Sequence, residues 1–265
     1  MIYFTENKSD MKRLTTCCTV ICLLAACSKH HDKPGDGGQG GKDSTVIRLK
    51  TAGANTYTYD SLARLARITY GNSVTGRTDY TYTKDSVLEK SFDQQGNPQG
   101  PYTIYYLNSD AISTHGRYII NPNATDIPAL FFNLTYDADR RLVEEFIGDE
   151  GSAPESHVVN YYNNGNEDSS KLFSAQTGLL AELTRYEYFT DKSNWLDPVY
   201  NGVSYIGKGN ASLLKKIVEM QTGDTTVIEY TYEFDADNKP IKRQAFLNGA
   251  PWGAAIDYTW VTMKL

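Results

Sequence analysis

The stretch TTVIEYTYEFDADNKPIKRQAFL, Thr225 to Leu247, decides the fold class. In its first half, Ile228, Tyr230 and Tyr232 fall on one face of an extended strand, because side chains alternate between the two faces. The segment Asp235 to Asn238 follows with turn chemistry, since Asp hydrogen-bonds its own backbone and Asn tolerates the left-handed conformation. The stretch therefore predicts an antiparallel hairpin with one buried face.

Related patterns recur along the chain, each with Tyr or Phe, then Asp, then a short turn and a return strand. The copies begin at Tyr59-Asp60, Phe92-Asp93, Tyr136-Asp137 and Phe234-Asp235. Two Asn-Gly steps, at 164–165 and 248–249, predict further tight hairpins. We therefore expect an all-β domain over residues 45–265, an antiparallel β-meander of such hairpins that forms a strongly curled sheet or a barrel-like shell.

The pattern from Tyr136-Asp137 to Arg141-Leu142 resembles the YD repeats of the RHS family, whose strands wind into curved β-sheet shells. The region from Arg185 to Gln244 also resembles a family of Bacteroidetes lipoproteins of unknown function, described as porin-like. That second resemblance is carried by the segments Tyr188–Asn194, Gly207–Asn210 and Leu213–Ile217. It implies a β-sheet fold and a cell-envelope location, and it brings no catalytic residue with it.

Two departures from these families stand out. Trp195 occupies the position where the lipoprotein family has Pro, and the Gly of the YD turn is replaced by Ala63, Arg140 and Asn238 in three copies. An Ala or Arg in the left-handed conformation costs on the order of 1 kcal/mol relative to Gly. Either those turns have a different shape, or the sheet tolerates the strain.

The N-terminal segment has the layout of a lipoprotein signal peptide over residues 1–26, with Met11 as the expected true start. Lys12 and Arg13 precede an apolar stretch that is shorter than the roughly 20 residues a membrane span needs. Leu24 to Cys27 resembles a lipobox, in which the cysteine becomes the acylated first residue of the mature chain. We expect a membrane partner through a lipid anchor on Cys27, and an outer-membrane location on the periplasmic or cell-surface face.

Residues 27–44 are polar and Gly-rich, which is typical of a flexible tether. His30 and His31 lie in it without further ligands at metal-site spacing, so we predict no metal and no cofactor. Cys27 is the only cysteine after residue 26, because Cys17, Cys18 and Cys22 lie in the signal segment. The fold is therefore expected to be held by its core and its sheet alone.

Charge excludes some partners. Residues 1–26 hold three of the 26 basic and two of the 32 acidic side chains, which leaves 23 basic and 30 acidic side chains in the mature chain. This mildly acidic balance without a basic run makes nucleic acid an unlikely partner. Glu229, Glu233 and Lys242 on neighbouring strands also argue against a transmembrane barrel, which needs a continuous apolar outer band.

The chain contains no nucleophile, zinc or phosphate-loop motif that would define an enzyme. His115 and His157 have no accompanying nucleophile, and the Asp137-x-Asp139 and Asp235-x-Asp237 pairs form turns more often than calcium loops. Adjacent acids, Glu144-Glu145 and Asp149-Glu150, could serve a glycosidase if folding brought two carboxyl groups together. The alternative function of a carbohydrate-active enzyme with dispersed carboxylates therefore stays open.

The segment Lys192 to Ala211 is expected to be the longest excursion from the sheet, and binding residues concentrate on such loops. Trp195, Tyr200 and Tyr205 are its candidate ligand-binding residues. We therefore favour a lipid-anchored envelope protein with a non-catalytic binding or scaffolding role. A glycan, a peptide or another envelope protein would be its ligand.

The anchor can be tested by metabolic labelling with palmitate. The wild-type protein should incorporate the label, whereas Cys27→Ala should not, because the acylated sulfur is removed. Equal labelling of the two proteins would contradict the lipid anchor.

Overall fold

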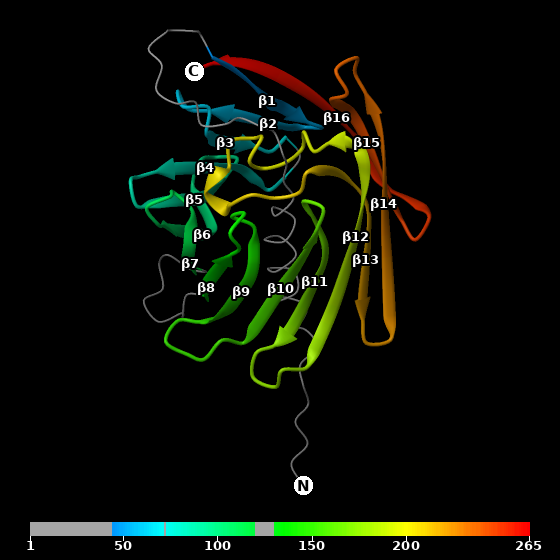
Figure 1. The fold of residues 1–265 in the computed structure, drawn as a ribbon. Helices are drawn as coiled ribbons and strands as arrows, with labels where there is room; N and C mark the ends of the chain where they lie inside the picture. The colour runs from blue at the N-terminus through cyan, green and yellow to red at the C-terminus, as the bar shows by residue number, and fades with distance from the viewer. Residues whose placement is uncertain (1–43, 72, 120–129) are drawn as a thin grey trace.

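A computed structural model describes residues 44–71, 73–119 and 130–265. In these ranges, sixteen antiparallel strands follow one another in sequence order around a single sheet, which closes into a barrel where β1 pairs with β16 (Figure 1). The expectation of an all-β meander is confirmed, and the barrel-like alternative is the one that the chain adopts. The predicted signal segment, the tether and Cys27 lie outside the described residues. No helix in the described ranges is long and apolar enough to cross a bilayer.

The strands have the following bounds: β1 Thr45–Ala52, β2 Asn55–Tyr59, β3 Leu65–Thr69, β4 Thr75–Tyr82, β5 Ser86–Asp93, β6 Pro98–Leu107, β7 Ser113–Ile119, β8 Leu130–Tyr136, β9 Leu142–Asp149, β10 Ser156–Asn163, β11 Asn166–Ser174, β12 Leu180–Ser193, β13 Ser212–Gln221, β14 Asp224–Phe234, β15 Pro240–Leu247 and β16 Ala250–Lys264. One short 3-10 helix, η1 Ser204–Ile206, interrupts the connection between β12 and β13.

The hairpin expected from Thr225 to Leu247 is formed by β14 and β15, with Tyr230 opposite Ala245. Ile228 and Tyr230 are both 8% exposed, which confirms the buried face. The Asn-Gly steps connect β10 to β11 and β15 to β16, as expected, and Asn164 and Asn248 both have positive φ. Alternation and the Asn-Gly steps therefore locate the β14–β15 hairpin and the turns after β10 and β15.

A five-residue turn recurs with one hydrogen-bond pattern. The N–H of its first residue donates to the carbonyl of the fifth, the N–H of the fourth donates to the carbonyl of the first, and the first side chain accepts from the N–H of the fifth. The first residues of these turns are Asp60, Asp93, Asn108, Asp137 and Asp235. The side chain of the first residue, Asp or Asn, therefore closes each turn.

The fourth residue of these turns is left-handed whether or not it is Gly. Ala63, Arg140 and Asn238 have φ of 54°, 65° and 60°, compared with 87° at Gly96. The turns without Gly therefore have the same shape as the turn with Gly. Of the two possibilities that the sequence raised, the second is correct: the sheet tolerates the backbone strain. The hydrogen bonds to the first side chain offset that strain, because charged acceptors bind N–H groups strongly.

Most of these turns lie at one end of the barrel, which we call the Asp-turn rim. It comprises the connections 60–64, 83–85, 108–112, 137–141, 164–165, 194–211 and 235–239. The first and last described strands also meet there, since Leu265 N–H donates to the Ser44 carbonyl. The tether would thus join the domain at the Asp-turn rim.

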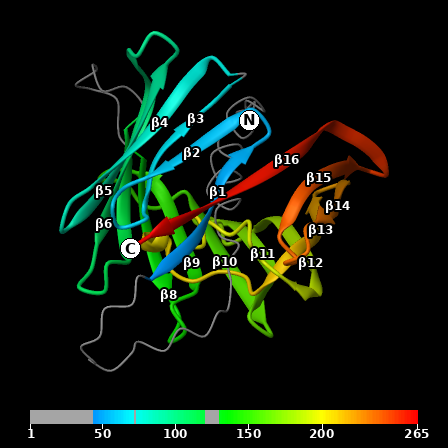
Figure 2. The same ribbon diagram turned by 90° about the horizontal axis from the view of Figure 1, so that it is seen from above.

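The inner face of the barrel is rich in tyrosine. Its core includes Val87, Tyr105 and Phe132, and partly buried tyrosines pack against it. Gly116 lies opposite both Tyr105 and Phe132, and a Cβ there would stand 2.1 Å from the Phe132 ring. A side chain at Gly116 would therefore displace the Phe132 ring. Figure 2 shows the strands surrounding this interior.

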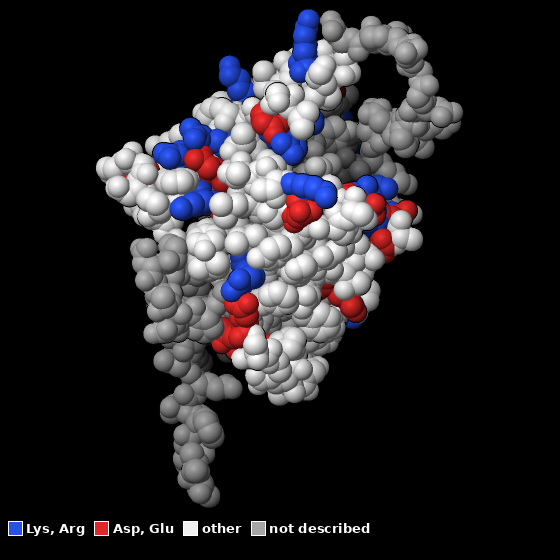
Figure 3. Space-filling model, turned by 90° about the vertical axis from the view of Figure 1, so that its left-hand side faces the viewer, with Lys and Arg blue, Asp and Glu red and all other residues white. Residues whose placement is uncertain are grey.

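The outer face of β12–β15 is polar and mixed in charge. Lys216 lies 3.4 Å from Glu187 and 4.0 Å from Glu229, on three consecutive strands, and Lys242 pairs with Glu233 at 3.5 Å. Figure 3 shows basic and acidic side chains side by side on another part of the surface. The charges that the sequence placed on neighbouring strands therefore form cross-strand pairs on the exposed face.

Replacement of Asp60 by Ala should lower the free energy of unfolding by about 1 to 2 kcal/mol at neutral pH, because the carboxylate accepts bonds from Arg64 and Leu62. Burial alone would raise the pKa of Asp60, but these bonds hold it below the ordinary value. The difference in unfolding free energy between wild type and Asp60→Ala should therefore shrink as pH falls through the folded-state pKa. Chemical denaturation of both proteins at several pH values measures this difference. Asp85→Ala, in an exposed turn, is the control, and an equal loss there would contradict the account.

Candidate functional site

The connection between β12 and β13, residues 194–211, lies across the Asp-turn rim, and we call it the crossing loop (Figure 1). Its Asn201 side chain accepts from the Leu49 N–H of β1, and its Gly202 carbonyl accepts from the Leu65 N–H of β3. Further along, the N–H groups of Lys208 and Ala211 donate to the turns after β8 and β10. The loop is therefore attached to several strands around the opening.

Asp197 shapes the first half of the crossing loop. Its side chain is fully buried, and Oδ1 accepts the Val199 N–H at 2.7 Å. Asn201 donates to the Asp197 carbonyl from both its backbone and its side chain. Burial raises the pKa of Asp197 well above the ordinary value, although the backbone N–H groups of Val199 and Tyr200 oppose this shift. The Asp197 carboxyl group therefore stabilises the turn that follows it.

Tyr205 is the anchor of the crossing loop. It is 3% exposed, and its ring centroid lies 4.9 Å from that of Tyr105 and 6.2 Å from that of Tyr82. The ring therefore fills part of the barrel interior. Of the three residues that the sequence suggested for ligand binding, Tyr205 is the one that is buried in the barrel interior.

The other two form an aromatic cluster with a residue that the sequence did not single out. The Trp195 ring centroid lies 5.4 Å from that of Tyr200 and 6.0 Å from that of Trp260, and all three side chains are half-buried. The Trp260 indole donates to the Pro240 carbonyl, and the Lys239 ammonium lies 5.9 Å from the Trp195 ring. We call Trp195, Tyr200 and Trp260 the mouth cluster. Its amphipathic rings suit a ligand with apolar faces and polar edges.

The adjacent acids lie on opposite faces of the sheet, because side chains alternate. Glu144 faces outward near His157, and Glu150 pairs with Arg117 outside the barrel. Glu145 faces inward and is 2% exposed. The sequence pairs therefore do not form carboxylate pairs in one cleft.

The inner face carries acids from other strands. Burial raises the pKa of Glu89 and Glu145 to about 7 and that of Glu167 to about 8, and the Tyr105 and Tyr80 hydroxyls oppose the shift at Glu89. The hydroxyl of Tyr105 lies 3.3 Å from Glu89. Among the described residues, no group of three or more His, Cys, Asp or Glu side chains could hold a metal ion. Glu145 was recognised in the sequence among the adjacent acids, but Glu89 and Glu167 were not singled out there, because their strand faces were ambiguous.

Comparisons with known proteins give the fold and little else. No protein-family model matches the chain, and no curated protein matches it. A porin-like protein from Bacteroides uniformis has a similar solved structure, with a TM-score of 0.52, 14% sequence identity, and coverage of 83% of this chain and 98% of that one. A porin-like protein from Bacteroides vulgatus is also similar, with a TM-score of 0.51, 12% identity, and coverage of 80% and 98%. The fold is thus that of porin-like Bacteroides proteins.

Replacement of Gly202 by Ala should detach the crossing loop. Gly202 has φ of 81°, and a Cβ would stand 2.6 Å from Leu65 N and 2.7 Å from the Ala63 carbonyl. We expect a loss of about 2 kcal/mol or more in unfolding free energy and faster proteolysis within the loop. Gly223→Ala is the matched control, since its φ is 82° with no atom within 4 Å. Equal behaviour of the two variants would contradict loop attachment.

Replacement of Glu145 by Gln should stabilise the protein above neutral pH. The unfolded carboxyl ionises near its ordinary value of 4.5, whereas the folded one ionises near 7. The unfolding free energy of the wild type therefore falls as pH rises between these two pKa values. The Gln variant does not show this fall, because its side chain does not ionise. The gain should reach up to about 3 kcal/mol at pH 8 and vanish at pH 4, measured by denaturant titration. The outward-facing Glu144→Gln should show no such pH-dependent gain.

Proposed function

We propose that the chain is a lipid-anchored envelope protein, attached to the outer membrane through Cys27, whose barrel binds a ligand without chemical turnover. The lipobox-like sequence supports the anchor. The likeness to porin-like Bacteroides structures supports an envelope barrel. The charged pairs on the outer face of β12–β15 support a barrel that lies in water beside the membrane, because a spanning barrel needs an apolar band that continues around all of its strands.

The mouth cluster is the observation that carries the binding role. Three aromatic side chains from the crossing loop and β16 meet at the Asp-turn rim and stay half-exposed. The hydrogen bonds of the crossing loop hold two of them in place, which reduces the ordering cost of binding. A glycan, or a peptide of another envelope protein, would supply the apolar faces that such rings bind.

A carbohydrate-active enzyme is the second candidate. It is supported by the raised pKa values of Glu89 and Glu145, both near 7, on the tyrosine-lined inner face. Neither carboxyl forms an ion pair within the described residues, and Glu145 Oε1 has no hydrogen-bond partner there. Burial raises the pKa of Tyr105, and Glu89 and Glu145 both raise it further, so the two acids lie near one tyrosine of the interior.

Glycan and peptide arrays probed with the purified protein test the proposal. Trp260→Ala and Trp195→Ala should each weaken binding by about tenfold or more, because each removes a large contact surface. Trp252→Ala, an exposed tryptophan away from the Asp-turn rim, should leave binding unchanged. Unchanged binding by both mouth variants would contradict the proposal, and hydrolysis of a bound glycan that is lost in Glu145→Gln would favour the enzyme.

A further inference from the structure

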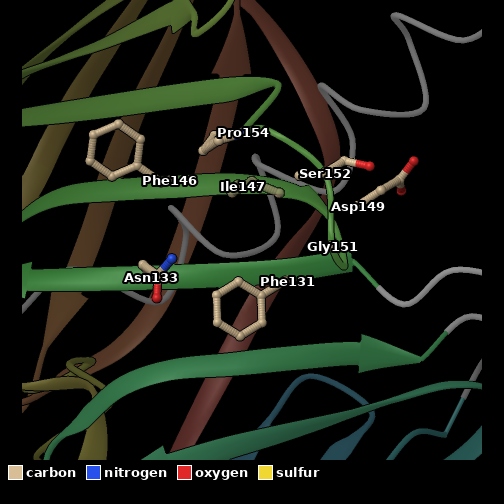
Figure 4. A pocket seen from close by; sticks show the side chains of 9 residues that line it. Phe131, Asn133, Phe146, Ile147, Asp149, Gly151, Ser152 and Pro154 are labelled. Atoms are coloured by element: carbon tan, nitrogen blue, oxygen red, sulfur yellow. The ribbon is translucent and has the colours of Figure 1, made fainter.

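A groove on the outer face of β8 and β9, separate from the mouth cluster, has the features of a second binding site. Its volume is about 250 Å³. The residues that line it include Phe131, Asn133, Phe146, Gly148 and Ser152. Figure 4 shows Phe131 and Asn133 on one strand, with Phe146 on the next and the turn residues at one end. We call this the outer groove.

Strand register builds the outer groove. Gly148 lies opposite Phe131, and Asn133 lies opposite Phe146. The missing side chain at Gly148 makes room for the turn after β9, since a Cβ at Gly148 would stand 2.9 Å from Pro154 Cα. The backbone of residues 153–155 therefore packs against β9 and forms one end of the groove. The ion pair between Arg117 and Glu150 joins β7 to this turn.

Two histidines fix the aromatic walls. The His157 ring is stacked on Phe146, with centroids 4.1 Å apart and an interplanar angle of 5°. The His115 ring lies 6.0 Å from Phe131 and is itself stacked on Tyr106 at 4.8 Å. The walls are therefore held in position before a ligand arrives, which favours binding.

The polar groups define the ligand class. The exposed Asn133 amide offers both a donor and an acceptor, and Ser152 adds a hydroxyl at the groove edge. This mixture of aromatic faces and hydroxyl-binding groups fits a sugar ring, which has apolar C–H faces and polar edges. The volume lies just below the roughly 300–1,000 Å³ of pockets for drug-sized molecules, so it suits one ring.

We propose that the outer groove binds one pyranose ring of a neutral oligosaccharide, packed against Phe131 and Phe146 and hydrogen-bonded by Asn133 and Ser152. Ring contacts extend on both sides of the groove, from Phe131 to Tyr106 on β6 and from Phe146 to Phe173 on β11, which gives neighbouring sugar units further aromatic contacts. This site does not depend on the mouth cluster.

Titration calorimetry of the purified protein with cellohexaose, maltohexaose and xylohexaose tests the proposal. At least one should bind, and Phe146→Ala and Asn133→Ala should each weaken that binding by about tenfold or more. Phe246→Ala, an outer-face phenylalanine on β15 opposite Glu229, and Trp195→Ala, in the mouth cluster, should stay within about twofold of the wild type.

Thermal unfolding checks that each variant folds, and Asn133→Ala suffices if Phe146→Ala does not, because Asn133 is exposed. The proposal is overturned if none of the three hexasaccharides binds, or if Asn133→Ala binds as tightly as the wild type. Loss of binding in Trp195→Ala alone would assign the sugar to the mouth cluster and would also overturn the outer groove.

Discussion

The pairing of β1 with β16 is the contact on which the other features depend. It removes the two free edges that a long antiparallel sheet would otherwise expose to other chains. It also places Leu49 opposite Trp260, which brings the last strand to the Asp-turn rim. Closure therefore creates both an interior for Tyr205 and the third ring of the mouth cluster.

A barrel of sixteen strands is wide, and its interior must be filled by something other than short aliphatic side chains. This chain uses tyrosines on the wall and one long connection across the rim. The hydroxyl of Tyr82 donates to the Leu65 carbonyl, and the Tyr205 ring packs beside Tyr82 and Tyr105. Buried acids such as Glu145 destabilise the same interior above neutral pH, which suggests that they are kept for a reason other than stability.

Local features of this fold were predictable from the sequence, and long-range ones were not. The hairpin of β14 and β15 and the five-residue turns follow from alternation and from Asp side chains, which act within a few residues. The site was only half predictable: Trp195 and Tyr200 stood out in a long Gly-rich segment, but Trp260 reaches them through the pairing of opposite chain ends. The burial of Tyr205 and the formation of the outer groove also depend on strand register. Local sequence patterns do not determine that register.

The attachment of the crossing loop to the barrel mouth is the central claim, and hydrogen–deuterium exchange resolved by peptide tests it most directly. The N–H groups of Asn201, Gly202 and Val203 all donate to carbonyls within the loop, and Asn201 also accepts from Leu49 of β1. We predict that peptides covering 198–206 exchange as slowly as those of β1. Exchange as fast as that of the exposed turn at 222–223 would contradict the account.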